Sequence, residues 1–409
     1  MHSSKDTGFA GSPPPRNAPA ARRARAALQA IWLALALAAC GGGVDSGGTG
    51  ATSSYASGSI TGFGSVIVNG VRFDDSTAAV RDEDGTLRGR DELRLGMSTE
   101  VRGSAIGTDA TGASVSIARS ITFGSEILGP VESVDAAAKS MVALGQTIVI
   151  NAATVFDAAT LAGGLVAIAP GDIVEVHALI DASTGRYTAT RVERKGAVSA
   201  YRLRGVVSQL DSAARSFNIG TERFSYAAYA GSPPATLANG SYVRLRLQTS
   251  RSAGLWSVLA FKDGTPSPQD MDEVRIDGVI NTFTSATLFS VDGVAVNAAG
   301  IVPPAGLALG ARVEVEGSSS AGILVASKLK LKTPDEVENQ DFELRGTISA
   351  LDAAGLNFVL RGVTVVYSLT TTEFRDGTIA DLQIARDVEA RGMLSADGTR
   401  LVATRIRFR

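Results

Sequence analysis

The chain has 409 residues, more than one hydrophobic core usually holds, which predicts several domains. Its 39 basic and 41 acidic residues give a formal net charge of −2, so bulk charge does not favour a polyanion and we expect no nucleic-acid partner. One cysteine and two histidines give too few ligands for a disulfide or a metal site, and we predict neither a metal nor a cofactor.

Residues 1–39 have the order of a bacterial export signal. Three arginines (Arg22, Arg23 and Arg25) precede an apolar run over 26–39, and Cys40 follows the small residues that end this run. A lipoprotein signal peptide is cleaved and acylated at such a cysteine, so we predict lipidation of Cys40 and a lipid anchor in the membrane. A retained anchor helix is the alternative, disfavoured because the run has 14 residues and a membrane span needs about 20.

Residues 40–57 are rich in glycine and serine and show no apolar period, so we expect a flexible tether. Gly41 stands directly after the cysteine. By resemblance to enterobacterial sorting rules, an aspartate at this position would favour retention in the inner membrane. We therefore expect an outer-membrane lipoprotein of the bacterial cell envelope, with the periplasmic and the surface-facing orientation both open.

Beyond residue 57 the sequence repeats at intervals of 68–76 residues. Each copy opens with a glycine followed two positions later by isoleucine or valine: Gly58/Ile60, Gly129/Val131, Gly205/Val207, Gly278/Ile280 and Gly346/Ile348. An alternating apolar strand then runs into a turn. The last shared landmark is a loop residue with apolar side chains three and five positions later: Gly96, Gly171, Gly240, Gly310 and, in the fifth copy, Ala385. Landmarks that keep their register five times predict a tandem array.

The repeated unit reads as β-structure. Apolar and polar residues alternate, as in Val313–Glu316, so one face of each strand is buried and the other is wet. Asn69-Gly70 and Asp292-Gly293 are typical of two-residue hairpin turns. About five strands per unit is the layout of a small OB-like barrel. We therefore predict an all-β tandem array of five five-stranded OB-like β-barrel domains. A small open sandwich and an SH3-like barrel are the alternatives.

We place the five domains at 58–126, 127–200, 201–270, 271–338 and 339–409. Linkers that combine proline with acidic residues lie at 263–270 and 332–341. Such residues do not continue a central strand, so we expect the chain to be loosest at these two linkers.

The first unit resembles a known family. Its opening, GFGSVIVNGVRF over 62–73, contains the matching residues Gly62, Phe63, Gly64, Ser65, Val68, Asn69, Gly70, Val71 and Phe73. In this it is similar to a repeated domain of unknown function found in bacterial exported lipoproteins. The later units keep the spacing but lose the Gly-Ser and Asn-Gly pairs. The resemblance implies a small β-barrel in the cell envelope and supplies no catalytic residues.

His177 is the only histidine after the export signal. Because Val174 and Val176 point inward in the alternating pattern, parity predicts that His177 lies on the wet face beside Glu175. Without an orienting partner or further metal ligands, we expect it to have no functional role.

The acidic segment Asp82-Glu83-Asp84-Gly85 predicts a surface turn. It does not have the spacing of a twelve-residue calcium loop, and calcium binding through this turn and Asp74-Asp75 is a minor alternative.

The residue pattern of the third unit predicts a binding surface on one of its faces. In the strand 242–247, Tyr242, Arg244 and Arg246 share the side opposite the inward valine and leucines, and Trp256 lies nearby in the sequence. Aromatic rings beside arginines suit sugars or anionic groups, and OB-like barrels bind such ligands on an exposed face. The alternatives are a solvated strand or a contact between units.

We expect a non-enzymatic envelope protein that acts as a scaffold, spacer or binding array, with envelope proteins or surface glycans as partners. The alternative is a carbohydrate-active or other hydrolytic enzyme that uses carboxylates. The pair Glu314/Glu316 lies on the wet face of a strand, which does not favour catalysis. Buried carboxylates with shifted pKa values in a cleft would favour the enzyme, and a row of barrels without a cleft would favour the array.

Overall fold

The computed structural model describes residues 53–262 and 268–409. The predicted export signal, Cys40, most of the predicted tether and residues 263–267 of the first predicted linker lie outside the described residues. Within them the chain is all-β with small closed five-stranded barrels, as predicted. None of the helices in the described ranges is long and apolar enough to cross a membrane. The described residues belong to one compact unit, so the barrels pack as one body.

The first barrel illustrates how the strands close. Barrel 1 consists of β1 (Ser53–Phe63), β2 (Val66–Val68), β3 (Val71–Asp74), β4 (Ala79–Asp82), β5 (Ser98–Ser104), β6 (Gly107–Thr108) and β7 (Ser114–Phe123). β1 pairs antiparallel with β2, and β2 with β3. β3 and then β4 pair parallel with β7, while β5 pairs antiparallel with both β7 and β1. This last pairing closes the circuit and removes the free edges of the sheet.

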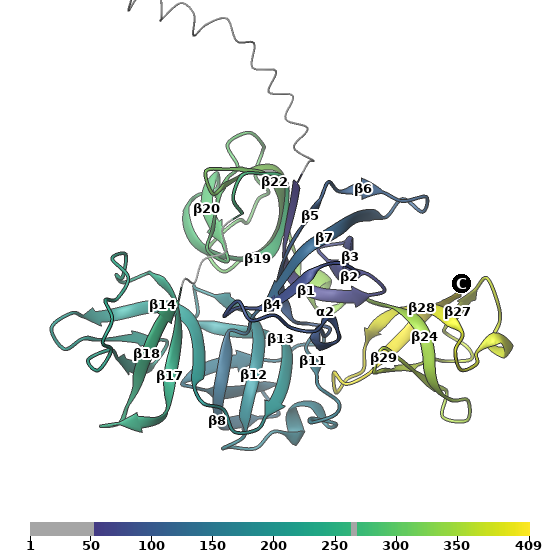
Figure 1. The fold of residues 1–409 in the computed structure, drawn as a ribbon, viewed down its shortest axis with the longest axis horizontal. Coiled ribbons are helices and arrows are strands. Elements are labelled where there is room, and N and C mark those ends of the chain that lie inside the picture. The colour runs from purple at the N-terminus through teal and green to yellow at the C-terminus, as the bar shows by residue number, and fades with distance from the viewer. Residues whose placement is uncertain (1–52, 263–267) are drawn as a thin grey trace, which may run out of the picture. The chain divides into compact units, whose positions relative to one another are not determined.

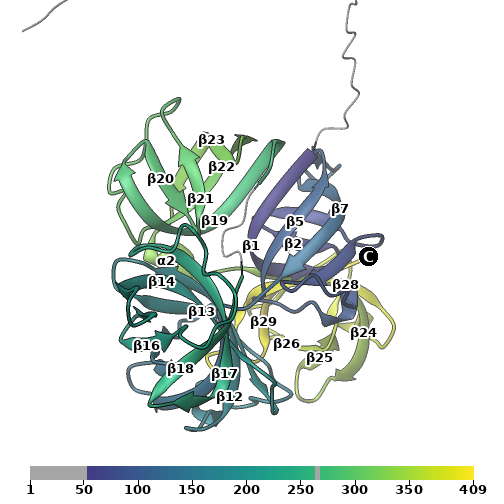
Figure 2. The same ribbon diagram turned by 60° about the vertical axis from the view of Figure 1, so that its left-hand side comes forward.

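The same order of pairing closes four further circuits, which are coloured from blue-green to yellow in Figures 1 and 2. Barrel 2 consists of β8 (Ile127–Asp135), β9 (Ser140–Ala143), β10 (Gln146–Val149), β11 (Val155–Phe156), β12 (Ile173–Asp181) and β13 (Arg186–Lys195). Barrel 3 consists of β14 (Tyr201–Asp211), β15 (Ser216–Ile219), β16 (Glu222–Ser225), β17 (Tyr242–Ser252) and β18 (Leu255–Lys262).

Barrel 4 consists of β19 (Met271–Ser285), β20 (Leu288–Val291), β21 (Val294–Asn297), β22 (Arg312–Ser320) and β23 (Ile323–Leu331). Barrel 5 consists of β24 (Phe342–Asp352), β25 (Asn357–Leu360), β26 (Val363–Val366), β27 (Glu373–Arg375), β28 (Asp387–Leu394) and β29 (Leu401–Phe408). Short 3-10 helices precede β5, β12 and β28: η1 (Arg90–Glu92), η2 (Gly164–Ala167) and η3 (Ile379–Asp381).

The two sequence landmarks of each repeat are hydrogen-bonded to each other. In barrel 1, Gly96 N donates to Ile60 O at 2.8 Å, and Ile60 N donates to Met97 O at 2.9 Å. The landmark residue has a positive φ, 79° at Gly96 and 68° at Ala385, which glycine adopts most readily. The equivalent bonds join Gly171 to Val131, Gly240 to Val207, Gly310 to Ile280 and Ala385 to Ile348. The repeat in the sequence therefore marks a hydrogen-bonded bridge from the first strand of each barrel to the loop before β5, β12, β17, β22 or β28.

The predicted hairpin turns are confirmed. Asn69 and Asp292 have φ of 50° and 46°, as two-residue hairpin turns require. The side chain of Asn69 folds back over β1 and comes so close to Gly58 that a Cβ there would lie 2.4 Å from Asn69 Oδ1. The opening glycine of this copy thus leaves room for the turn residue.

The hydrophobic cores are shared between barrels. One cluster joins buried residues of barrels 1 and 5, a second joins barrels 2 and 3, and a third occupies barrel 4 with Tyr55 of β1. Strand pairing also crosses barrels: β1 pairs with β19 and β24, and β8 pairs with β14. A barrel of about 70 residues buries a modest core, so sharing it with a neighbour adds buried area.

The structure corrects one expected boundary and shows a short helix within one predicted linker. Residues 53–57, expected in the tether, belong to β1, where 54–57 pair with both β5 and β19. The linker at 332–341 contains the helix α2 (Pro334–Glu338). Thr333 caps this helix, since its Oγ1 accepts from Glu336 N at 3.3 Å and Glu336 Oε2 accepts from Thr333 N at 3.0 Å.

Candidate functional site

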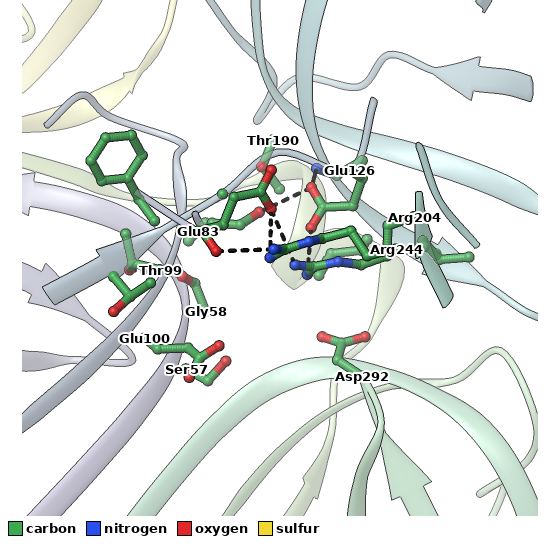
Figure 3. Close-up of a pocket in the computed structure, with 18 of the residues that line it drawn as sticks. Ser57, Gly58, Glu83, Thr99, Glu100, Glu126, Thr190, Arg204, Arg244 and Asp292 are labelled. Carbon is green, nitrogen blue, oxygen red and sulfur yellow. Dashed lines mark hydrogen bonds and ion pairs between the residues drawn. The ribbon is translucent and has the colours of Figure 1, made fainter. Parts of the chain in front are cut away.

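A cavity of about 200 Å³ lies where barrels 1 to 4 meet, and we call it the junction cavity (Figure 3). Its charged side chains come from barrels 1, 3 and 4 and from the joint between barrels 1 and 2: Glu83, Glu100, Glu126, Arg204, Arg244 and Asp292. Figure 3 shows the two arginines reaching toward Glu83 and Glu126, with Asp292 on the opposite side. Hydroxyl groups, among them Ser57, Thr99 and Thr190, complete the lining.

Glu83 is the centre of an ion-pair network. It lies in the predicted acidic turn, which is confirmed by the hydrogen bond from Gly85 N to Asp82 O at 2.9 Å. Its carboxylate contacts three arginines of barrel 3, Arg202 at 2.7 Å, Arg244 at 3.1 Å and Arg204 at 3.5 Å. The Glu83 side chain is only 3% exposed. The turn is therefore a contact between barrels and not a solvated loop.

Glu126 lies in the short joint between barrels 1 and 2 and is buried. Its Oε2 accepts hydrogen bonds from Ala178 N at 2.6 Å and Ser98 Oγ at 3.3 Å, and its Oε1 lies 3.4 Å from Arg204 Nη1. Burial raises the pKa of Glu126 to about 7, although Arg204 acts in the opposite direction. This carboxyl group would change its charge near neutral pH.

Asp292 faces the same cavity from the β20–β21 turn. Its Oδ1 accepts a hydrogen bond from Val279 N at 3.2 Å. Burial raises the pKa of Asp292 to about 7 as well. The cavity thus holds two carboxyl groups that exchange protons near pH 7. Acid–base catalysis at neutral pH would need such groups.

The prediction that one face of barrel 3 is exposed is wrong. Parity holds, because Val243, Leu245 and Leu247 are buried inside the barrel. The opposite face is covered, however: Arg244 is 9% exposed and donates to Glu83 O at 2.9 Å as well as to its carboxylate. Barrel 1 thus occupies the side that the alternating pattern assigned to water.

The four residues proposed for ligand binding do not meet at one site. Tyr242 and Arg244 line the junction cavity, and burial raises the pKa of Tyr242. Arg246 is half-buried and is not among the residues that line this cavity. Trp256 is 5% exposed and packs in the core, edge-on to Tyr201 at 5.5 Å with the Arg251 guanidinium 4.6 Å from its ring centre.

His177 is buried, in contrast to the prediction, with 1% exposure. It does lie on the outer face of β12, as parity requires, but barrel 1 covers that face. Ser98 N donates to Nδ1 at 3.1 Å, and Gly124 O lies 2.9 Å from the same nitrogen. Burial lowers the pKa of His177 to about 4, so the ring is neutral at physiological pH.

The other acidic candidates occupy ordinary ion pairs. Glu316 contacts Lys328 at 2.7 Å, and Glu314 contacts Lys332 at 3.4 Å. In the part of the chain that the structure describes, no group of three or more histidine, cysteine or acidic side chains is placed to hold a metal ion.

Glu126, Arg204 and Asp292 were not predicted as members of a site, although they line the junction cavity together with the predicted Tyr242 and Arg244. Asp292 was recognised only as a turn residue, and no role was predicted for Glu126. Arg202 and Arg204 alternate with apolar residues in β14, as expected for any strand with a wet face. The available signal was the shortness of the joints 123–126 and 195–200, which brings barrels 1, 2 and 3 close together.

Comparison with known proteins assigns no activity. A family model described as a domain of unknown function (DUF5666) matches residues 129–193, 263–330 and 345–407. These matches fall on barrels 2, 4 and 5, and none includes the opening at 62–73. No curated protein matches the chain. Three segments between residues 129 and 407 are therefore similar to one repeated domain of unknown function.

Proposed function

We propose that the chain is a non-enzymatic, lipid-anchored protein of the bacterial cell envelope whose five OB-like barrels serve as a scaffold. The observation that supports it best is that barrel 1 bonds to each of the other four barrels. A central barrel with four attached neighbours holds their outer surfaces in a fixed arrangement, which suits a platform for envelope proteins or surface glycans. The predicted export signal before Cys40, and the resemblance of the opening at 62–73 to that of exported lipoproteins, support the proposed location.

The contacts of barrel 1 with barrels 2 and 3 are polar and largely buried. Thr190 Oγ1 donates to Gly96 O at 2.7 Å, and Arg191 Nη1 donates to Leu95 O at 3.2 Å. Glu83 binds the arginines of barrel 3 as described. Breaking buried ion pairs is costly, so these contacts favour one arrangement of the barrels.

The contacts with barrels 4 and 5 combine strand pairing with side-chain bonds. Asn69 Nδ2 donates to Arg275 O of barrel 4 at 3.0 Å, alongside the β1–β19 pairing. Arg72 forms an ion pair with Glu343 of barrel 5 at 2.7 Å, beside the β1–β24 pairing. A strand that pairs with two neighbouring barrels fixes both of them to its own barrel.

The junction cavity fits a structural role better than a catalytic one. Its volume of about 200 Å³ lies below the roughly 300–1,000 Å³ of small-molecule sites. Glu83 and Glu126 point their oxygens at Arg204, Arg244 and backbone donors and not into the open space. Ion-pair networks that support a structure also shift pKa values, so the shifts alone do not indicate catalysis.

The anchoring part of the proposal is tested at Cys40. Cys40→Ser should abolish incorporation of a radiolabelled fatty acid and leave uncut precursor in the membrane fraction. Equal label in the wild type and the variant would end this part of the proposal.

The scaffold part is tested by cross-linking in cells followed by purification of the tagged full chain. We expect the same envelope partners to be enriched with the wild type and with the double variant Glu126→Gln/Asp292→Asn, since the scaffold does not use the cavity carboxyls. Absence of any partner enriched over an untagged strain would contradict the scaffold.

A second candidate is a hydrolytic enzyme of the envelope, and the two carboxyl groups with pKa values of about 7 are the observation that favours it. In that case the wild type should release reducing ends from envelope polysaccharide, and Glu126→Gln should lose this activity. Equal release by the wild type and Glu126→Gln, or no release by either, would contradict the hydrolytic function.

A further inference from the structure

A second cavity, of about 510 Å³, lies between barrels 1, 2 and 5 and is independent of the junction cavity. Part of its wall is apolar and includes Phe63, Leu95 and Phe156. Five arginines also line it: Arg90, Arg94, Arg191, Arg361 and Arg400. We call it the arginine-lined cavity. Its volume falls in the range of sites that enclose small organic ligands, about 300–1,000 Å³.

Two of these arginines have no carboxylate partner within the described residues. Arg94 donates to the backbone carbonyls of Asp91 and Leu93, the latter at 3.0 Å. Arg361 Nε donates to Arg345 O at 2.9 Å, and its guanidinium lies 5.9 Å from the centre of the Phe63 ring. Both side chains are exposed, so their remaining N–H groups face solvent or a ligand.

Each of the other three arginines has a carboxylate partner. Arg90 and Arg400 form long contacts, at 3.8 Å with Asp75 and at 3.9 Å with Asp397. Arg191 is buried and paired with Glu193 and Asp157. Asp91 and Asp157 are the acidic residues among the lining. The excess positive charge of the wall therefore comes from Arg94 and Arg361, against the single carboxylate of Asp91.

We propose that the arginine-lined cavity binds an amphiphilic anion, a molecule with a phosphate or carboxylate head and an apolar chain. The guanidinium groups of Arg94 and Arg361 match the geometry of such a head and bind it with charge-assisted hydrogen bonds. The apolar wall takes the chain out of water. This binding goes beyond the scaffold function and does not depend on it.

The proposal is tested by calorimetric titration of the chain from Gly41 onward, which retains the whole compact unit 51–409. The probes are hexyl phosphate, octyl phosphate, inorganic phosphate and octanol, each below its aggregation concentration. Octyl phosphate should bind about tenfold more tightly than hexyl phosphate, since each buried methylene contributes about 0.8 kcal/mol. Inorganic phosphate and octanol, which lack one half of the ligand, should bind at least tenfold more weakly.

Two double variants test whether the ligand binds in the arginine-lined cavity. Arg94→Gln/Arg361→Gln should weaken octyl phosphate binding tenfold or more with an unchanged far-ultraviolet spectrum, because both arginines are exposed. The matched control Arg119→Gln/Arg186→Gln removes the same charge from two exposed arginines that do not line the cavity and should bind as the wild type does.

Three results would overturn the proposal. Equal losses in both double variants would indicate attraction by overall charge. Equal affinity for inorganic phosphate and octyl phosphate would remove the apolar part of the site. An affinity for octanol as high as that for octyl phosphate would remove the anionic part.

Discussion

Glu83→Gln removes the carboxylate that three arginines of barrel 3 share while keeping the size of the side chain. Arg202, Arg204 and Arg244 all lie within 3.5 Å of it, and each is less than a quarter exposed. Removing one member of a buried ion pair costs about 3–5 kcal/mol, because the remaining charge stays buried without its partner.

The cost at Glu83 should fall at the lower end of that range. Each arginine keeps a second carboxylate: Glu175 at 3.2 Å for Arg202, Glu126 at 3.4 Å for Arg204 and Asp84 at 3.7 Å for Arg244. We therefore expect Glu83→Gln to lower the free energy of unfolding by about 3 kcal/mol.

The assay is urea unfolding of the chain from Gly41, followed by fluorescence. Trp256 is then the only tryptophan, and it is buried in the core of barrel 3, so its signal reports the unfolding of the barrel that loses its partner. The free-energy change follows from the midpoint and slope of this transition.

Glu373→Gln is the matched control. Glu373 pairs with Arg375 at 2.8 Å and Arg405 at 3.0 Å but is 48% exposed, so the same substitution should cost less than about 1 kcal/mol. If Glu83→Gln costs no more than this control, the network does not hold barrels 1 and 3 together and the reasoning fails.

Three further predictions concern pH and backbone geometry. Burial raises the pKa of Asp292 to about 7, so its contribution to stability is present below pH 4 and is lost as pH rises toward 7. Asp292→Asn should therefore be more stable than wild type at pH 8 by about 4 kcal/mol and gain nothing at pH 4, and a pH-independent difference would contradict this. Burial lowers the pKa of His177 to about 4, so its ring proton resonances should not titrate between pH 5.5 and 7.5; an inflection near pH 6.5 would show an accessible ring. Gly96→Ala should lower the melting temperature more than Gly171→Ala, because an added Cβ at Gly96 would lie 2.3 Å from a backbone carbonyl oxygen of barrel 2, whereas one at Gly171 would meet nothing within 4 Å. The two glycines are otherwise matched, since their φ angles are +79° and +92° and both donate the bridging hydrogen bond. Equal melting temperatures of the two variants would argue against that contact.

The interior of each barrel was predictable from the sequence. Alternation at period two identified the inward residues of β17, and the buried Val243, Leu245 and Leu247 confirm it. The turns at Asn69 and Asp292 were predictable because few residue types adopt a positive φ easily. The repeated glycines pointed to a shared geometry, which is the hydrogen-bonded bridge between the first strand and the following loop. All of these features depend on interactions within one repeat, and the chemistry of a short segment determines them.

The outer faces of the barrels depend on their neighbours, and a strand pattern carries no information about them. Arg244 and His177 both lie on the outer side that parity assigned, yet both are buried because barrel 1 covers them. The junction cavity brings together Glu83, Glu126 and Asp292 from segments far apart in the chain. Two carboxyl groups reach pKa values of about 7 only because other barrels exclude water from them. Sequence thus determined the repeat and its inward face, and the packing of barrels decided which polar groups are buried together.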